Sequence, residues 1–117
     1  MPISTKRVYD AAEPTDGYRV LVDRLWPRGL SKATLKMDAW MKDIAPSPEL
    51  RRWFAHDESK WVQFQKRYAK ELDGHADLVR ELRERARGAR LTLLYAARDE
   101  LHNSAALLKK YLERGTA

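Results

Sequence analysis

Residues 90–96 read Arg-Leu-Thr-Leu-Leu-Tyr-Ala, and they carry the strongest strand signal in the chain. A second stretch of this kind, Tyr-Arg-Val-Leu-Val-Asp, occupies residues 18–23, and Pro27 and Gly29 then end it. Its nearly continuous apolar centre is typical of a strand that is covered on both faces, as in a parallel sheet. These two stretches indicate an α/β fold, because helical patterns lie between them.

Near the N-terminus, residues 3–9 mix β-branched and aromatic side chains and predict a first strand. The segment 11–17 contains Pro14, Asp16 and Gly17, which favour a turn. Residues 37–44 are ambiguous, because their apolar residues fit a helical face while the portion from Asp38 to Ile44 also fits a short strand. We favour the strand.

Four helices are predicted. The first begins at Ser47-Pro48-Glu49, since serine caps a helix and proline suits its first position, and it runs to about Phe54. The second follows Asp57 with Trp61, Phe64, Tyr68 and Leu72 on one face. The third spans about 75–87 and ends at Gly88, and a last helix capped by Asp99 runs to about Glu113. The chain is therefore expected to be one domain, 1–117, with a small, mainly parallel three- or four-stranded sheet and about four packed helices.

Composition excludes several classes of protein. The 117 residues include no cysteine, so disulfides, thiolate zinc sites and cysteine nucleophiles are ruled out. No apolar run is long enough for a membrane span and the N-terminus lacks a signal peptide pattern, so we expect a cytoplasmic protein without membrane partners. The net charge of +6 is compatible with an anionic partner.

Charged residues follow the ends of three predicted strands. Tyr9-Asp10 closes the first, Asp23-Arg24 the second, and Arg98-Asp99 the last, leading into His102-Asn103. If these strands are parallel, their carboxyl ends meet at one edge of the sheet, where ligands bind in open α/β sheets. Trp26 and Arg28 would join them there.

These residue types suggest a small anionic or phosphorylated ligand. Arg24, Arg28 and Arg98 would hold the anion, because guanidinium groups bind carboxylate and phosphate in a planar, bidentate way. Asp23 would orient an arginine or act as a base, and His102, expected in the first turn of the last helix, is an acid/base candidate. The amide groups that open this helix would add to the anion site. No cofactor motif occurs, and His56, His75 and His102 lack the spacing of metal ligands.

Structural explanations stay open for the same residues. Asp23 and Arg24 could form a local ion pair, and Asp99 is explained by its role as a cap. The connection from Asp10 to Gly17 is short for a parallel crossover. If the first two strands instead form a hairpin, Asp10 lies at the opposite end.

Two other functions also stay open. The run Arg80, Arg83, Arg85, Arg87 and Arg90 is broken only by Glu81 and Glu84 and could form a nucleic-acid-binding face within 80–90. Alternatively, the chain is a protein-interaction module in which the charges at the strand ends only stabilise loops.

Several segments together resemble the DUF488 family, in its short YeaO-like branch. They are Lys6-Arg7-Val8-Tyr9-Asp10, the stretch from Asp16 through Val22-Asp23-Arg24-Leu25-Trp26-Pro27-Arg28-Gly29, Ala45-Pro46-Ser47, and Leu93 to Asp99 with His102-Asn103. This family is of unknown function, so the resemblance implies a fold with parallel first strands and does not indicate which activity, if any, the chain has. Longer members carry a Cys-His-Arg string where this chain reads Leu101-His102-Asn103. Only the histidine matches, so thiol chemistry does not carry over.

Overall fold

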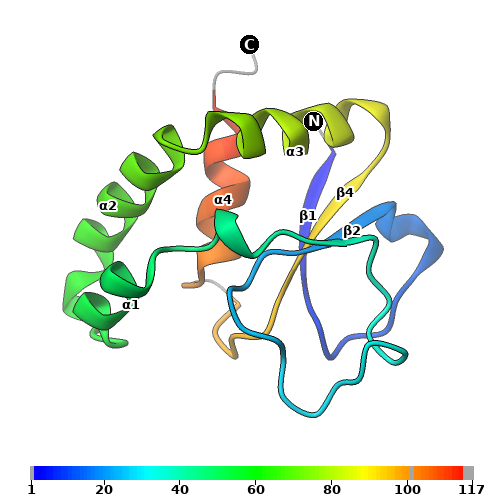
Figure 1. The fold of residues 1–117 in the computed structure, drawn as a ribbon, viewed down its shortest axis with the longest axis horizontal. Coiled ribbons are helices and arrows are strands. Elements are labelled where there is room, and N and C mark those ends of the chain that lie inside the picture. Colours follow the sequence, from blue (N-terminus) through cyan, green and yellow to red (C-terminus); the bar gives the residue numbers. More distant parts are fainter. Residues whose placement is uncertain (1, 101, 115–117) are drawn as a thin grey trace.

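The computed structural model describes residues 2–100 and 102–114. Its sheet has the strand order β1-β4-β2-β3, and every neighbouring pair is parallel. The strands are β1 (Ile3–Arg7), β2 (Tyr18–Leu21), β3 (Ala39–Trp40) and β4 (Leu91–Tyr95). The predicted fold class, a small parallel α/β sheet with packed helices, is confirmed (Figure 1).

The position of β4 between β1 and β2 settles the direction of the first two strands. Each of them pairs with β4 in parallel, so they run the same way and do not form a hairpin. Residues 8–17 connect them, with one 3-10 turn η1 (Pro14–Asp16). The short connection therefore joins two strands that are not neighbours.

Four helices pack on this sheet: α1 (Pro48–Phe54), α2 (Trp61–Asp73), α3 (Ala76–Gly88) and α4 (Ser104–Glu113). The α1 start confirms its prediction, because the Ser47 hydroxyl accepts a hydrogen bond from the Leu50 amide at 3.1 Å. The predicted end of α3 at Gly88 is also confirmed. The predicted start of the last helix at Asp99 is wrong, since α4 begins at Ser104.

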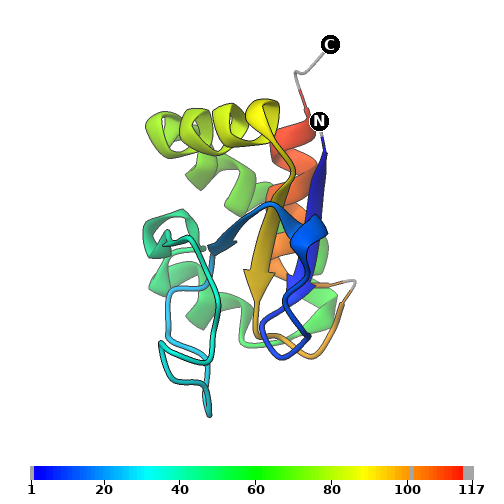
Figure 2. The ribbon, with the colours of Figure 1, turned by 90° about the vertical axis from the view of Figure 1, so that its right-hand side faces the viewer.

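The helices cover one face of the sheet. Alternate strand residues such as Val20, Leu91 and Leu93 belong to one buried core with side chains from all four helices. Figure 2 shows the strands in front of α2 and α4, with α3 across the top. The opposite face carries a smaller core that includes Leu21 and Leu94, and it is covered by the connecting segments around Val8 and Leu35.

Residues 37–44 contain both local patterns that their sequence allows. Ala39–Trp40 form the edge strand β3, as favoured, and Lys42–Ile44 form a single 3-10 turn η2. Within the described residues this strand pairs with β2 alone, and it is two residues long. A further 3-10 turn, η3 (Glu58–Lys60), leads into α2. No helix in the described part of the chain is long and apolar enough to span a bilayer.

Candidate functional site

The carboxyl ends of β1, β2 and β4 lie at one edge of the sheet, because the three strands run the same way (Figure 1). This part of the expected geometry is confirmed. The residues that follow the strand ends nevertheless make their contacts in separate groups.

Asp23 follows β2 and holds this strand to its neighbours. Its carboxylate accepts a hydrogen bond from the Ala96 amide at 2.8 Å, and its main-chain oxygen accepts one from the Trp40 indole at 2.7 Å. Burial raises the pKa of the Asp23 carboxyl, while the bond from Ala96 and the charge of Arg51 act in the opposite direction. The contacts of Asp23 are therefore those of a residue that fixes the strand ends.

Arg24 contacts the segment before α1. Its guanidinium donates to the main-chain oxygens of Ala45 at 3.2 Å and Pro46 at 3.4 Å, and it lies 3.8 Å from the Asp43 carboxylate. The local ion pair between Asp23 and Arg24 that the sequence left open is not formed in the described chain. Arg24 anchors a loop, and its donors are largely engaged there.

Tyr9 and Arg28 come together at the same edge, beyond β1. The Tyr9 hydroxyl donates to the main-chain oxygen of Arg28 at 2.9 Å, and the Arg7 guanidinium lies over the Tyr9 ring at 5.1 Å. Arg7 also donates to the main-chain oxygens of Ala96 and Ala97. These bonds join the segments after β1, β2 and β4, and the Arg28 side chain is exposed.

Trp26 is engaged within its own loop. Its indole N–H donates to the Leu30 oxygen at 2.6 Å, and its ring meets the Trp40 ring edge-on at 5.4 Å. Both rings belong to the smaller core on the loop-covered face. Packing within the loop thus accounts for Trp26, which the sequence predicted to lie at the ligand site.

Asp10 and Asp99 both influence Tyr95 at the end of β4. Burial raises the pKa of the Tyr95 hydroxyl, and the charges of Glu100, Asp10 and Asp99 raise it further, while Arg7 opposes them. Acidic groups from two strand ends therefore lie near one phenol. Arginine and acid are both present at this edge, as the sequence predicted.

Asn103, rather than Asp99, caps the last helix. Its side-chain oxygen accepts from the Ala106 amide at 2.8 Å, and its amide group donates to the main-chain oxygen of Asp99 at 2.9 Å. The backbone of Asn103 is extended, as an N-cap requires. Because helix α4 begins only at residue 104, His102 precedes the helix and does not lie in its first turn.

Asp99 and His102 form a polar pair in the loop before α4. One oxygen of Asp99 accepts from the His102 amide at 3.0 Å, and the other lies 3.0 Å from Nδ1 of the imidazole. About half of each side chain is exposed, at 48% for Asp99 and 54% for His102. The edge of the His102 ring meets the Trp61 ring at a centroid distance of 5.2 Å.

This pair forms one wall of a cleft of about 340 Å³. The other wall is the junction between α1 and α2. This junction and the segment after β4 both lie at the end of the molecule to which the strands point (Figure 1). Four aromatic or imidazole rings and two carboxylates line it: Phe54, His56, Glu58, Trp61, Asp99 and His102. Among the predicted site residues, the cleft gathers Asp99 and His102.

The α1–α2 junction has an unusual backbone. Ala55 and His56 both have a positive φ, at 47° and 59°. Residues other than glycine rarely adopt this backbone conformation. Residues with such strained backbones cluster at functional sites. They persist only where the surrounding structure holds them in place. Histidine occurs at positive φ more often than most residues, but no sequence pattern predicts this conformation at Ala55 and His56 in succession.

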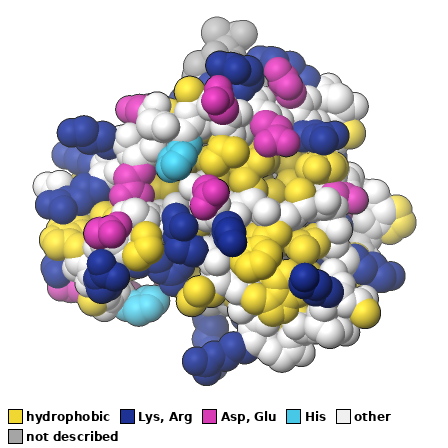
Figure 3. Space-filling view, viewed as in Figure 1, with side chains coloured by type: hydrophobic (Ala, Val, Ile, Leu, Met, Phe, Trp, Pro, Cys, Tyr) yellow, Lys and Arg dark blue, Asp and Glu magenta, His cyan; other side chains and the backbone are white. Residues whose placement is uncertain are grey.

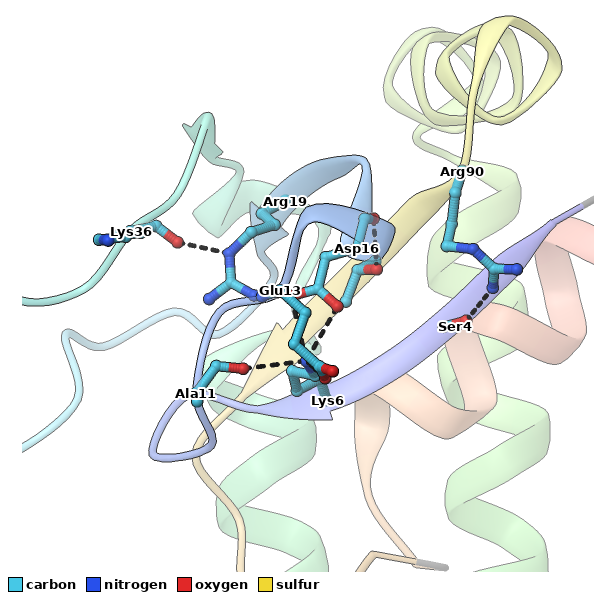
Figure 4. Close-up of polar contacts among 9 residues, drawn as sticks. Ser4, Lys6, Ala11, Glu13, Asp16, Arg19, Lys36 and Arg90 are labelled. Carbon is cyan, nitrogen blue, oxygen red and sulfur yellow. Dashed lines mark hydrogen bonds and ion pairs between the residues drawn. The ribbon is translucent and has the colours of Figure 1, made fainter.

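A charged network on the loop-covered face was missed by the sequence analysis. Lys6 donates to Asp16 at 2.9 Å and to Glu13 at 2.7 Å, and Arg19 pairs with the same Asp16 carboxylate (Figure 4). Arg19 also donates to the main-chain oxygen of Lys36 at 2.6 Å. Asp16 and Arg19 are buried, so the network secures the turn before β2 to β1.

The network shifts the ionisation of its members. Burial alone would raise the pKa of the Asp16 carboxyl, but hydrogen bonds from Lys6, the Glu13 backbone and Arg19 outweigh it and lower that pKa. Hydrogen bonds to Asp16 and then Glu13 raise the pKa of Lys6. Both groups are therefore held in their charged forms.

Most arginines of the run 80–90 contact other groups of this chain, although their side chains lie at the surface. Arg83 donates to the main-chain oxygens of Tyr111, Leu112 and Arg114 at the end of α4. Of the other arginines in the run, Arg80 pairs with Asp77, Arg85 lies over the Tyr18 ring, and Arg90 donates to Ser4. Figure 3 likewise shows Lys and Arg side chains scattered among acidic ones on the face it presents.

Comparison with known proteins places the chain in a family. Residues 2–117 match a family described as the inactive DUF488-N3 subclade. The protein YeaO of Escherichia coli is 46% identical over 112 residues, covering 96% of this chain and 97% of the relative. Rv3073c of Mycobacterium tuberculosis and Mb3100c of Mycobacterium bovis are each 40% identical over 110 residues, covering 94% of this chain and 92% of theirs.

All three relatives are described as uncharacterized proteins. No solved structure matches the chain. The family predicted from the sequence motifs is thus confirmed over residues 2–117: this chain belongs to the DUF488 family, in its inactive DUF488-N3 subclade.

Proposed function

We propose that this chain binds a small ligand, without transforming it, in the cleft between Trp61 and His102. The cleft combines an aromatic wall with the polar Asp99–His102 pair, a composition typical of small-molecule sites. The observation that carries the proposal is this pairing of aromatic and polar groups beside the strained backbone of His56.

The charge of the lining favours a ligand that donates hydrogen bonds or carries positive charge. Glu58 and Asp99 contribute carboxylates, and the described lining includes no lysine or arginine. Phe54 and Trp61 would contact a flat ring or a cation through their π-faces. A nitrogen-bearing aromatic compound satisfies both requirements.

Binding without chemistry agrees with two further observations. The carboxylate of Asp23, the predicted base, is engaged by the Ala96 amide, and no described contact joins it to His102. The family is described as inactive. His102 and Asp99 would then position a ligand rather than transfer a proton.

The anionic ligand predicted from the sequence remains the second candidate. Arg24 is held by the loop before α1, so this hypothesis would depend on Arg98. Arg98 is exposed and makes no ion pair within the described chain. Arg98 directly precedes Asp99, so an anion at the mouth of the cleft is the form of this hypothesis that remains.

A matched pair of probes tests the proposal. Benzamidine and benzoate share a flat ring and differ in the sign of their charge. We expect benzamidine to shift the NMR signals of the Trp61 indole and of residues 54–61 and 99–102, with a Kd of about 1 mM for a fragment of this size. Benzoate should have a much smaller effect.

Variants locate the binding. Glu58→Gln and Asp99→Asn should each weaken benzamidine binding several-fold, while Glu49→Gln, an exposed acid on α1 outside the cleft, should leave it unchanged. Shifts produced by benzoate alone would favour the anionic ligand. Shifts by neither probe in these residues would overturn the assignment of the cleft.

A further inference from the structure

A second hollow lies between α2 and α4, away from the cleft. Its volume is about 420 Å³, and we call it the α2–α4 groove. Its buried lining residues are apolar or aromatic and its exposed ones are basic. The buried residues are Tyr68, Leu72 and Leu107, and the exposed ones are Lys66, Lys110 and Arg114.

Among the described residues, the three basic side chains have no acidic partner. None of them makes an ion pair with another described residue, and no described acidic side chain lines the groove. Unpaired cations around an apolar floor complement an acidic partner that also presents an apolar side chain. This combination differs from the cleft, whose lining contains two carboxylates.

A neighbouring hollow extends the basic surface. It lies between α3 and the end of α4, is lined by Arg80, Arg83 and Arg87, and shares Tyr111 with the groove. Its acidic member, Asp73, already accepts a hydrogen bond from the Tyr111 hydroxyl at 2.6 Å. The positive surface therefore continues past Tyr111 from one hollow to the next.

We propose that the α2–α4 groove docks an acidic segment of a partner protein, with a leucine-sized side chain seated on Ala69 and Leu107. An amphipathic helix suits this site, because it places apolar anchors on one face and acids beside them. Lys66, Lys110 and Arg114 pair with those acids at the margin of the groove.

A nucleic acid fits the same surface less well. Arg83 and Arg114 lie 5.8 Å and 5.1 Å from the centre of the Tyr111 ring, so this ring is already in contact with two cations. Arg83 also donates to the end of α4, which engages its guanidinium. Single strands bind by stacking bases on exposed aromatic faces, and the Tyr111 ring is already covered by these cations.

Fluorescence anisotropy with designed peptides tests the docking site. The probe is a labelled helical peptide of glutamate and leucine, with the leucines on one face. The comparisons are the same peptide with lysine for glutamate, a glutamate–alanine peptide without leucine, and a labelled oligothymidylate. We expect the glutamate–leucine peptide to bind best and its affinity to fall as salt is raised.

Charge reversal assigns the binding to the groove. Lys66→Glu with Lys110→Glu should weaken peptide binding about tenfold, since two attractive contacts become repulsive. The control, Lys32→Glu with Lys36→Glu, changes the net charge equally at exposed positions outside the groove and should alter affinity less than about twofold. Thermal melting of each variant verifies that it is folded.

Two results would overturn the proposal. Equal binding of the peptide to the Lys66/Lys110 variant and to the parent protein would place the interaction elsewhere. Tighter binding of oligothymidylate than of the peptide, lost in the same variant, would make the surface a nucleic-acid site.

Discussion

The carboxylate of Asp23 and the main-chain N–H of Ala96 are joined by a hydrogen bond of 2.8 Å, which ties the end of β2 to the end of β4. These two strands are neighbours at the centre of the sheet. Beyond the strand ends, the hydrogen bonds between neighbouring strands stop. The Ala96 amide therefore needs another acceptor, and the Asp23 carboxylate supplies it. Asp23, which the sequence suggested as a catalytic base, thus stabilises the end of the sheet.

Replacing Asp23 measures how much its hydrogen bond to the Ala96 amide stabilises the fold. Asp23→Ala leaves the Ala96 amide without its acceptor and should lower the free energy of unfolding by about 1–2 kcal/mol. Asp23→Asn keeps an acceptor oxygen and should lower it less. Urea denaturation of the three proteins measures both effects, and equal stability of the alanine variant would contradict this assignment.

The clustering of polar residues at one edge was predictable, and their partners were not. The continuous apolar centre of the second strand favours a parallel sheet, whereas the direction of the first strand is decided by its pairing with β4. Arg24 instead binds the main-chain oxygens of Ala45 and Pro46, which any residue type could offer. Contacts to distant backbone have no sequence signal, so a charged residue at a strand end predicts a location better than a role.

The helix cap illustrates a second limit. Asp99 and Asn103 are both good N-cap residues, and each precedes an apolar helical pattern. The choice depends on the loop, in which the Asn103 side chain reaches back to the Asp99 oxygen. Local propensity therefore gave the helix and misplaced its start.

Two alanine variants test the corrected cap. Asn103→Ala should lower the free energy of unfolding by about 1 kcal/mol, because the Ala106 amide loses its capping oxygen. Asp99→Ala removes a half-exposed side chain outside the helix and should cost less. Thermal or urea unfolding ranks the two, and the opposite order would restore Asp99 as the cap.

Gly17 lies where no other residue fits. A Cβ atom there would be 2.1 Å from the main-chain oxygen of Arg90, and its φ is 67°. Gly17→Ala should therefore lower stability by about 3 kcal/mol, from backbone strain and steric overlap together.

Gly29 provides the matched control for Gly17. It has a similar positive φ of 78°, but nothing lies within 4 Å of a Cβ atom added there. Gly29→Ala should cost only the backbone strain, about 1–2 kcal/mol. Chemical denaturation of both variants isolates the overlap with Arg90, and equal losses would show that the close approach does not matter.

The network around Asp16 predicts a pH dependence of stability. Hydrogen bonds from Lys6 and Arg19 outweigh burial and lower the pKa of Asp16 in the folded protein, so the unfolded chain binds more protons at acid pH. The stability contributed by Asp16 is then complete above its ordinary pKa of 3.8 and is lost as the pH falls below that value. Asp16→Asn should be less stable than the parent at neutral pH, and the difference should narrow on acidification.

Lys6 limits the stability that this network contributes at alkaline pH. Hydrogen bonds to Asp16 and then Glu13 raise its pKa, so its contribution is present below its ordinary value of 10.5 and is lost as the pH rises through the raised pKa. Urea unfolding of the parent and of Asp16→Asn from acid to alkaline pH measures both limits. As control, Asp77→Asn on the surface of α3 should change stability by less than about 0.5 kcal/mol. A constant difference between the parent and Asp16→Asn at every pH would mean that the carboxylate contributes through packing rather than charge.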